Sequence, residues 1–328
     1  MGKRRIRNLK ANGINDIIGF DSNNLRCKEV HEQYQVPTYQ KIEEALEQKP
    51  IGVIISTPPN AHMGYAIQAA KQGMHLFTEA GTCIEGMDEL IHISKNNNII
   101  AAPSCTLRFQ ASIQKIKQLI MSGDIGDPLA FTHHCGQYLP DWHPWEDYRN
   151  FYVSKRETGA CREIVPFELN WLVWLFGWPT NISGYKAKVS SLDCDIDDIY
   201  QIILDFDRTI MGHLQVDVIA RSPTRSLRIL GSLGTLEWNM IEKTLRFYDI
   251  KAKTWSIIEE TKQEAVSGYS EMSVEQMYIE EIAAFLNAIK GQKVYPHSFE
   301  DDKRILKLLF AVEANDEKAS QAKAVAYA

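Results

Sequence analysis

A glycine and an aspartate near the start of the chain have the spacing of a dinucleotide-binding site. Gly2 precedes a helix-forming segment, and Asp21 follows a short apolar run 19 residues later. In dinucleotide folds a pyrophosphate binds the free backbone N–H groups at a helix N-terminus, and an acid about 20 residues on binds the ribose hydroxyls. A single glycine is not a fingerprint, because the two earlier glycines of that motif would lie upstream of Met1. Asp21 could equally cap a helix start beside Ser22 and Asn23, so both interpretations stay open.

The cysteines and histidines give no metal-binding pattern. Six cysteines are scattered so that the closest two, Cys83 and Cys105, are 22 positions apart, which excludes C-x-x-C and zinc-knuckle spacings. His133 and His134 would point to opposite faces of a strand and could not bind one metal ion together. We therefore expect no metal, and reduced thiols of the kind found in cytoplasmic proteins.

The overall composition is that of a soluble globular protein. Apolar residues make up 45% and charged residues 24% of the 328 residues, and the net charge of −6 disfavours nucleic acid as a partner. No stretch approaches the ~18 apolar residues of a membrane span, and no apolar segment of a signal peptide follows the basic run at 3–10. We interpret that basic run as a solvated helix face. These features predict a cytoplasmic protein of about two domains that binds neither nucleic acid nor membrane.

The first part of the chain alternates β-forming runs with helix-forming segments. The run 51–56 is apolar at nearly every position, as expected for a parallel strand covered on both faces. The alternation predicts a parallel sheet with right-handed crossovers, whose ligand site lies outside the carboxyl ends of the strands. The predicted strands are 16–20, 51–56, 74–78 and 99–104, and the predicted helices are 3–12, 24–34, 40–48 and 61–72.

From about residue 125 the pattern changes to successive β-forming runs separated by turns. These runs predict an antiparallel sheet of about six strands, with one long helix before it and two after it. The predicted strands are 181–188, 199–206, 211–220, 225–230, 235–238 and 244–249, and the predicted helices are 163–176, 273–290 and 299–319. The fold class is therefore α/β, a Rossmann-like parallel sheet followed by an α+β domain with an open antiparallel sheet.

Several segments follow one another in an order that is typical of one enzyme family. Segment 54–62, Ile-Ile-Ser-Thr-Pro-Pro-Asn-Ala-His, is similar to that family's strand-to-loop segment, and segment 2–9 is similar to the helix after its glycine turn. Segments 158–163 and 174–177 are similar to its substrate-side helix. Together, over nearly the whole chain, they resemble the Gfo/Idh/MocA family of NAD(P)-dependent oxidoreductases. Within 136–149 the chain looks like a branch associated with surface-polysaccharide and nucleotide-sugar pathways.

This resemblance implies a domain organisation and a reaction. It implies a Rossmann domain over residues 1–105, and a substrate and dimerisation domain over residues 106–328 that forms a homodimer or tetramer through its sheet. It also implies hydride transfer between NAD or NADP and a hydroxyl or carbonyl carbon of a sugar or nucleotide sugar. Asp21 favours NAD, because a carboxylate repels the 2′-phosphate of NADP. The alternative is a non-catalytic nucleotide- or sugar-binding protein on the same scaffold.

The chain departs from the family at its usual catalytic positions. Segment 79–81 reads Glu-Ala-Gly where the family has Glu-Lys-Pro, so the lysine is replaced by Ala80. Phe167 stands where the family has a histidine. Neither side chain can transfer a proton, so another group must take the hydroxyl proton as hydride leaves the same carbon.

Three residues are candidates for that group. Glu163 stands where the family has an aspartate, and a carboxylate in a partly apolar cleft can act as a base. Glu168, five positions on, would face a different way from the helix. His143 and Tyr138, on a loop expected to line the sugar site, are the other candidates. A helix-stabilising role for Glu163, with no competent base in the chain, also stays open.

The remaining predicted cofactor residues come from the same resemblance. His62 is interpreted as a cofactor-loop contact or a cap, and Arg108 as a group that holds a carboxylate or phosphate or forms a salt bridge. The predicted cofactor-binding residues are Gly2, Asp21, Thr57, Pro58, Asn60, His62, Glu79 and Arg108.

The start of the chain predicts an incomplete sheet. In the usual strand order 3-2-1-4-5-6 one strand lies between the runs 16–20 and 51–56, and no segment here supplies it. Without it these two runs would be about 9.6 Å apart, too far for hydrogen bonds. We expect the natural gene product to start upstream of Met1, and the chain as written to bind NAD(P) weakly or not at all.

Overall fold

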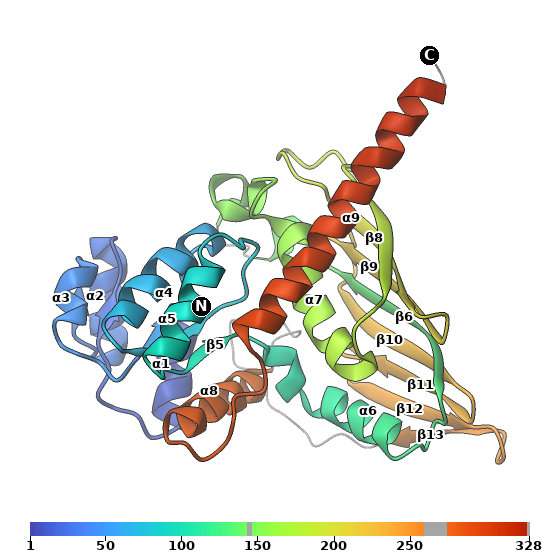
Figure 1. Ribbon diagram of the computed structural model, residues 1–328, viewed down its shortest axis with the longest axis horizontal. Coiled ribbons are helices and arrows are strands. Elements are labelled where there is room, and N and C mark those ends of the chain that lie inside the picture. The colour runs from blue at the N-terminus through green and yellow to red at the C-terminus, as the bar shows by residue number, and fades with distance from the viewer. Residues whose placement is uncertain (143–145, 259–273, 327–328) are drawn as a thin grey trace. The chain divides into compact units, whose positions relative to one another are not determined.

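The computed structural model describes residues 1–142, 146–258 and 274–326, with side chains described up to residue 317 (Figure 1). The chain divides into two compact units. The first unit comprises Met1–Thr106 and Gln276–Lys303, and the second comprises Leu107–Glu275 and Arg304–Ala328. None of the described helices is both long and apolar enough to cross a membrane.

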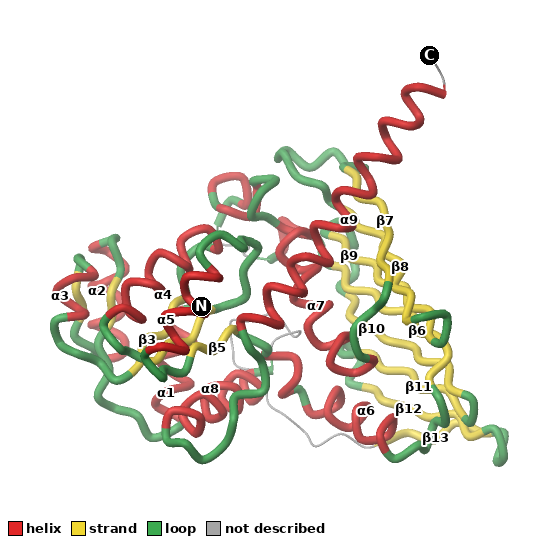
Figure 2. Tube along the Cα trace, in the orientation of Figure 1, coloured by secondary structure: helices red, strands yellow, loops and turns green. Residues whose placement is uncertain are grey.

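The first unit contains two short parallel sheets and the helices that alternate with their strands (Figure 2). One sheet pairs β1 (Gly19–Phe20) with β2 (Thr38–Tyr39), and the other has the order β3 (Gly52–Ile55), β4 (His75–Thr78), β5 (Ala101–Pro103). The helices are α1 (Gly2–Ala11), α2 (Asn24–Tyr34), α3 (Ile42–Leu46), α4 (His62–Lys71), α5 (Met87–Asn96) and α8 (Glu275–Ile289). This alternation confirms the predicted parallel sheet architecture.

The two sheets are not hydrogen bonded to each other, as the sequence predicts for the runs 16–20 and 51–56. β1 is paired on one side only, so the predicted five-residue strand shrinks to Gly19–Phe20. In the larger sheet the register aligns Ile55, Thr78 and Pro103, and the residues after these three strands therefore meet at one edge. Parallel sheets bind their ligands at this edge.

Two helices in this unit are followed by glycines in a left-handed conformation. Gly13 after α1 and Gly73 after α4 have φ values of +78° and +77°, a left-handed conformation that glycine adopts without a steric penalty. α4 turns Ala66, Ala69 and Ala70 into the core, where small side chains let a helix approach a sheet closely.

The second unit is built on one sheet of eight strands, two more than predicted, in the order β13-β12-β11-β10-β6-β9-β8-β7. The strands are β6 (Pro128–Gly136), β7 (Asn181–Ala187), β8 (Ile199–Phe206), β9 (Ile210–Asp217), β10 (Thr224–Gly231), β11 (Gly234–Asn239), β12 (Thr244–Asp249) and β13 (Thr254–Ile258). The sheet is mostly antiparallel, as predicted, and it has one parallel pair that was not predicted, because β6 lies between β10 and β9 and runs parallel to β9.

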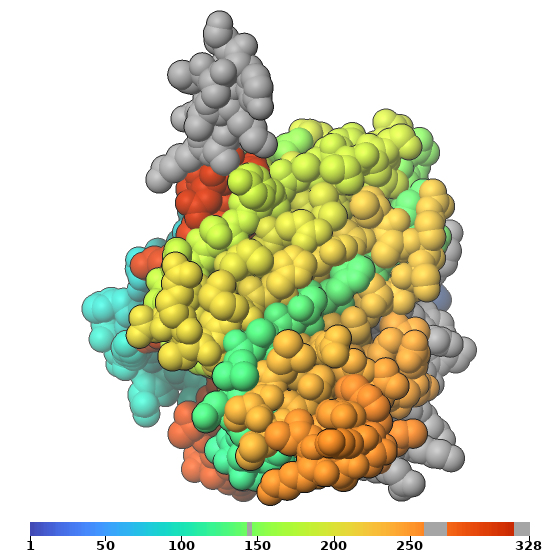
Figure 3. Space-filling model, turned by 90° about the vertical axis from the view of Figure 1, so that its right-hand side faces the viewer, coloured from blue at the N-terminus to red at the C-terminus, as the bar shows by residue number. Residues whose placement is uncertain are grey.

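The helices of this unit are α6 (Ala111–Met121), α7 (Ala160–Phe176) and α9 (Phe299–Ala326), whose first residues belong to the first unit. α7 packs against β8 and β9. Along β8 the residues Tyr200, Ile202 and Leu204 are buried, and the residues between them point to the other face. That outer face lies at the surface in Figure 3, where the strands run side by side in yellow, green and orange.

Candidate functional site

The carboxyl edge of β3–β4–β5 brings polar side chains together. Ser56 follows β3 and Glu79 follows β4, and the Ser56 hydroxyl donates to Glu79 Oε1 at 2.9 Å. Ser104 follows β5 and donates its hydroxyl to Oε1 of Glu281 on α8 at 3.0 Å. Two carboxylates, Glu79 and Glu281, therefore lie near the edge where a dinucleotide fold places its ligand.

Arg5 of α1 binds both of these carboxylates. Its Nε lies 2.7 Å from Glu79 Oε1 and its Nη2 lies 2.8 Å from Glu79 Oε2 and 2.9 Å from Glu281 Oε2. The Arg5 side chain is 2% exposed and Glu281 is fully buried. Burial alone would raise the pKa of Glu79, but the charge and hydrogen bonds of Arg5 outweigh it and hold that pKa below its usual value.

The expectation that the basic run forms a solvated helix face is therefore wrong for two of its members. Arg4 and Arg5 are buried, and both lie over the ring of Tyr278. Residue type alone cannot distinguish them from the less buried Lys3, Arg7 and Lys10. Spacing offers a signal, since Arg5 precedes the apolar Leu9 by one helical turn and so shares its face.

The loop after β3 is fixed by His62. The His62 ring is buried, its Nε2 donates to the Thr57 carbonyl oxygen at 2.8 Å, and burial lowers its pKa. A Cβ at Gly81 would lie 3.3 Å from His62 Nδ1, so the glycine leaves room for the ring. The Thr57 hydroxyl is buried with no hydrogen-bond partner among the described residues. A donor without a partner at this edge fits a site that binds a polar ligand.

Asp21 follows β1 and starts the turn into α2. Its Oδ1 accepts a hydrogen bond from the Asn23 backbone N–H at 2.8 Å, and its Oδ2 lies 3.8 Å from an exposed Arg26. The helix itself is capped by Asn23, whose side chain accepts from the Leu25 N–H. Asp21 is thus not the cap, and its side chain stays 35% exposed at the end of the strand.

The other predicted cofactor residues lie in different surroundings. α1 begins at Gly2 and has no side-chain cap, and Pro58 and Asn60 belong to the turn that leads into α4. Arg108 belongs to the second unit, where its Nε donates to Asn170 Oδ1 at 2.7 Å and its Nη2 donates to the Asn170 carbonyl at 3.0 Å. Arg108 is thus held against α7 by Asn170.

The first turn of α7 carries Glu163, the leading candidate for the base. The hydroxyl of Tyr152 donates to Glu163 Oε1 at 3.2 Å. Tyr152 lies in a short 3-10 turn, Tyr152–Ser154, ahead of the helix. Residue types alone do not reveal the pairing of this tyrosine with Glu163.

Glu168, one and a half turns further along α7, faces a different way from Glu163, as expected from its spacing, and is buried in the core. Its Oε2 lies 2.8 Å from both His133 Nε2 and Trp171 Nε1, and its Oε1 lies 2.8 Å from Arg225 Nη2. Burial would raise the pKa of this carboxyl, but Arg225 and His133 hold it at about 2. Glu168 is therefore a structural anion. The guanidinium of Arg225 also lies 5.9 Å from the ring of Phe167.

The two adjacent histidines of β6 lie on opposite faces, as predicted. His133 is fully buried, with Nδ1 2.8 Å from the Ser226 carbonyl oxygen. His134 is on the outer face, 2.6 Å from Asp217 Oδ2. No cluster of three metal-ligating side chains occurs among the residues that the structure describes.

Tyr138 and His143 are the two remaining catalytic candidates. The guanidinium carbon of Arg221 lies over the ring of Tyr138, 3.6 Å from the centroid of that ring. His143 lies outside the described residues.

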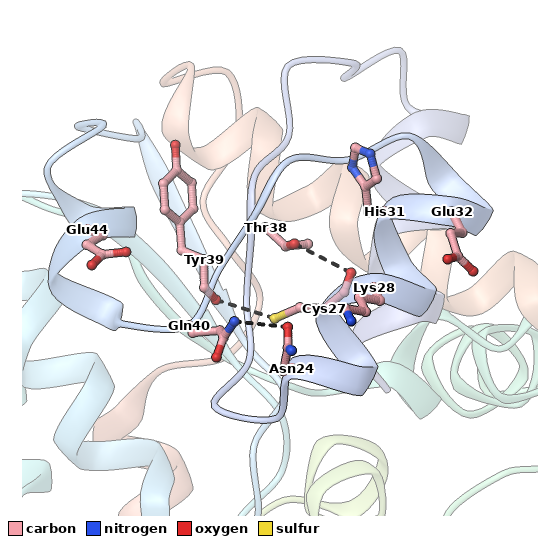
Figure 4. A pocket seen from close by; sticks show the side chains of 9 residues that line it. All are labelled: Asn24, Cys27, Lys28, His31, Glu32, Thr38, Tyr39, Gln40 and Glu44. Carbon is pink, nitrogen blue, oxygen red and sulfur yellow. Dashed lines mark hydrogen bonds between the residues drawn. The ribbon is translucent and has the colours of Figure 1, made fainter.

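A cavity of about 400 Å³ lies in the first unit beside α2 (Figure 4). It is lined by α2, by Thr38–Tyr39 of β2 and by Glu44 of α3. None of the predicted cofactor residues lines it. Cys27, which lines the cavity, donates its thiol to the Asp21 carbonyl oxygen at 3.2 Å, so the cavity lies beside the turn that carries Asp21.

Comparison with known families agrees with this architecture. Residues 1–102 match the oxidoreductase family with an NAD-binding Rossmann fold, GFO/IDH/MocA, and residues 113–237 match the GFO/IDH/MocA C-terminal domain. The two matches together span more than half of the chain. The chain belongs to the GFO/IDH/MocA family of oxidoreductases, and its first unit is an NAD-binding Rossmann domain.

The curated relatives are distant. An uncharacterized oxidoreductase from Streptococcus pneumoniae is 24% identical over 57% of this chain and 52% of its own length. An uncharacterized oxidoreductase from Schizosaccharomyces pombe is 23% identical over 47% of this chain and 42% of its own length. The chain thus matches only about half the length of these relatives.

Solved structures share the fold over nearly the whole chain. An oxidoreductase from Agrobacterium radiobacter, in complex with NAD+, L-tartaric acid and magnesium, has a TM-score of 0.85 at 16% identity and covers 97% of this chain and 94% of its own. A levoglucosan dehydrogenase, in complex with NADH and levoglucosan, has a TM-score of 0.81 at 18% identity, with coverages of 97% and 95%. The WlbA dehydrogenase from Bordetella pertussis, in complex with NADH and UDP-GlcNAcA, has a TM-score of 0.78 at 16% identity, with coverages of 97% and 94%.

Proposed function

We propose that this protein is an NAD-dependent dehydrogenase of a sugar or nucleotide sugar, with Glu163 as the base that takes the hydroxyl proton. Membership of an NAD-binding oxidoreductase family supports the reaction class. The levoglucosan and UDP-GlcNAcA complexes of structural neighbours support the substrate class. The observation that carries the assignment is the Glu163 carboxylate, held by Tyr152 in the first turn of α7.

The first unit provides groups that fit the cofactor. Asp21 would bind the ribose hydroxyls through its exposed carboxylate, and the buried Thr57 hydroxyl would find a partner in the nucleotide. Bound NAD supplies a hydride acceptor. Glu79, engaged by Arg5, would act by holding the loop after β4 in place. Asp21 also favours NAD over NADP, because its charge repels a 2′-phosphate.

In the oxidation the carbon–hydrogen bond breaks with its electron pair leaving as hydride, and the hydroxyl proton passes to the Glu163 carboxylate. Ala80 and Phe167 stand at the family's usual lysine and histidine positions and cannot accept that proton. Tyr138 and His143 remain second candidates for the proton acceptor.

The assembly and setting of the enzyme belong to the same proposal. We infer that the outer face of the eight-stranded sheet binds a second copy of the chain, and light scattering of the purified protein would test this. We place the reaction in surface-polysaccharide or nucleotide-sugar synthesis in the cytoplasm.

The proposal is tested by the formation of NADH with the purified protein and a panel of UDP-sugars and free sugars. We expect turnover with at least one sugar, and a fall of about 10²–10⁴-fold in Glu163→Gln with NAD binding retained. Full activity in Glu163→Gln would exclude this residue as the base. NAD binding without turnover on any sugar would instead indicate the non-catalytic alternative.

A further inference from the structure

Tyr152 and Glu163 form a hydrogen bond whose direction is fixed by chemistry. A carboxylate can only accept, so the phenol donates its proton to Glu163 Oε1 across 3.2 Å. A donor of this kind stabilises the ionised carboxylate relative to the protonated acid. Tyr152 therefore contacts the carboxylate that the proposed reaction needs.

The chain between these residues is closed tightly upon itself. The Thr158 hydroxyl donates to the Tyr152 carbonyl oxygen at 2.8 Å, and the Gly159 N–H donates to the Lys155 carbonyl at 2.8 Å. A Cβ at Gly159 would lie only 2.1 Å from the Val153 carbonyl oxygen, so only glycine permits this approach.

The start of the helix is also unusual. Ala160 has a φ of +46°, a left-handed conformation that a residue with a Cβ rarely adopts, and its side chain is fully buried. Such backbone conformations persist where surrounding contacts determine them, and they cluster at functional sites. The unusual residue lies three positions before Glu163, so the turn that sets the Tyr152–Glu163 distance is strained.

The same turn is anchored from outside. Arg156 binds Asp195 at 2.8 Å and Asp197 at 2.7 Å, and Lys155 forms a β-bridge with Asp195. These contacts tie the turn to the loop before β8. The exposed ion pairs are individually weak, but together with the bridge they limit the positions that the turn can take.

We propose that Tyr152 is a positioning residue for Glu163: its hydroxyl holds the carboxylate in one orientation and keeps it ionised, ready to accept the substrate proton. This inference rests on the proposed function only in its last clause. The pairing and its effect on the carboxylate are properties of the second unit alone.

The pairing is tested without any turnover by titrating the Glu163 carboxyl carbon by NMR in glutamate-labelled protein, with Glu163→Gln used to assign the signal. Removing a hydrogen bond to an ionised group predicts that Tyr152→Phe raises the pKa of Glu163 by about one unit. Thr158→Val, which removes the hydroxyl that holds the Tyr152 backbone, should raise it by less. An unchanged Glu163 titration in Tyr152→Phe would overturn the proposal.

Tyr200→Phe provides the matched control. The Tyr200 hydroxyl also donates to a glutamate of the same unit, Glu313, at 3.3 Å, and that glutamate is bound by Arg162. The substitution removes the same atom from the same kind of pair, and it should leave the Glu163 titration unchanged. An equal shift in both variants would mean that the effect is general, and it would contradict the assignment.

The proposed effect of Tyr152 on proton acceptance by Glu163 is tested by the pH profile of kcat/KM. If Tyr152 keeps Glu163 ionised, Tyr152→Phe moves the acid limb to higher pH by the shift seen by NMR and restores most of the rate at the alkaline plateau. A uniform loss of kcat/KM at every pH would indicate a merely structural role for Tyr152 and would contradict its proposed effect on proton acceptance. Full turnover in Glu163→Gln would refute the proposed function while leaving the NMR result to judge the pairing.

Discussion

Glu79 and Asp21 both follow parallel strands of the first unit, yet they are bound in different ways. Glu79 accepts hydrogen bonds from Nε and Nη2 of Arg5 and from the Ser56 hydroxyl. Asp21 accepts a backbone N–H and keeps a partly exposed carboxylate. α7 of the second unit repeats the contrast, because Glu168 is buried against Arg225 whereas Glu163 accepts a phenol hydroxyl.

The binding partner of each carboxylate indicates whether that carboxylate can bind a ligand or accept a proton. An arginine that is buried with a carboxylate fixes the charge of that carboxylate, so Glu79 and Glu168 serve the fold. A carboxylate bound by a neutral donor can still bind a ligand or gain a proton. We assign Asp21 and Glu163 to cofactor and substrate, because Asp21 keeps a partly exposed carboxylate beside the exposed Arg26 and Glu163 accepts a hydrogen bond from Tyr152.

The largest expected effect comes from breaking the Arg5 cluster. Arg5→Met leaves Glu79 and the fully buried Glu281 without their counter-charge, which should lower the free energy of unfolding by about 3–5 kcal/mol. Urea unfolding followed by circular dichroism measures this. Lys3→Met is the control on the same helix, because its ion pair with Glu29 is exposed and its loss should hardly change the midpoint. Equal effects of the two substitutions would contradict the structural role given to Arg5.

A somewhat smaller effect, with a defined pH dependence, is expected at Glu168. Its folded pKa of about 2 lies below the usual 4.5, so its contribution to stability is complete above the unfolded value and is lost as the pH falls from about 4.5 towards 2. Glu168→Gln should therefore cost about 3 kcal/mol at neutral pH and roughly 1 kcal/mol less by about pH 4. Unfolding of both proteins at several pH values would reveal a pH-independent difference if this account of Glu168 is wrong.

The smallest effect is expected from the substitution of Asp21 in the first unit. Asp21→Asn removes the charge that favours the ribose hydroxyls and repels a 2′-phosphate, so NAD affinity should fall about tenfold and the preference over NADP should narrow. Calorimetric titration with both nucleotides checks this. Asp16→Asn, at an exposed acid five positions earlier, should change neither affinity. Unaltered NAD binding in Asp21→Asn would remove this residue from the cofactor site.

Local patterns in the sequence predicted much of the fold. The helix 24–34 and the strands 199–206 and 244–249 have the predicted bounds, because their caps and alternation are local signals. The lack of hydrogen bonds between the two parallel sheets of the first unit was also predicted, from the number of strands found in the sequence. The parallel pairing of β6 with β9 did not, since it joins segments about 80 residues apart and depends on the whole sheet.

The site was harder to predict than the fold. Residue types led to Glu163 and Asp21, but not to the partners that distinguish them from Glu79 and Glu168. Arg5 contacts Glu281 across 276 positions of the chain, and His133 on strand β6 contacts Glu168 on helix α7. Such long-range contacts decide whether an acid is fixed or available, and no local pattern encodes them.

Isotope transfer tests the central claim most directly. A sugar that supports turnover, deuterated at the carbon that carries the reacting hydroxyl, is incubated with the protein and NAD, and the reduced cofactor is examined by mass spectrometry. Direct hydride transfer predicts one deuterium in the NADH and a slower reaction than with the unlabelled sugar. NADH without deuterium, or no sugar that yields NADH at all, would contradict the account.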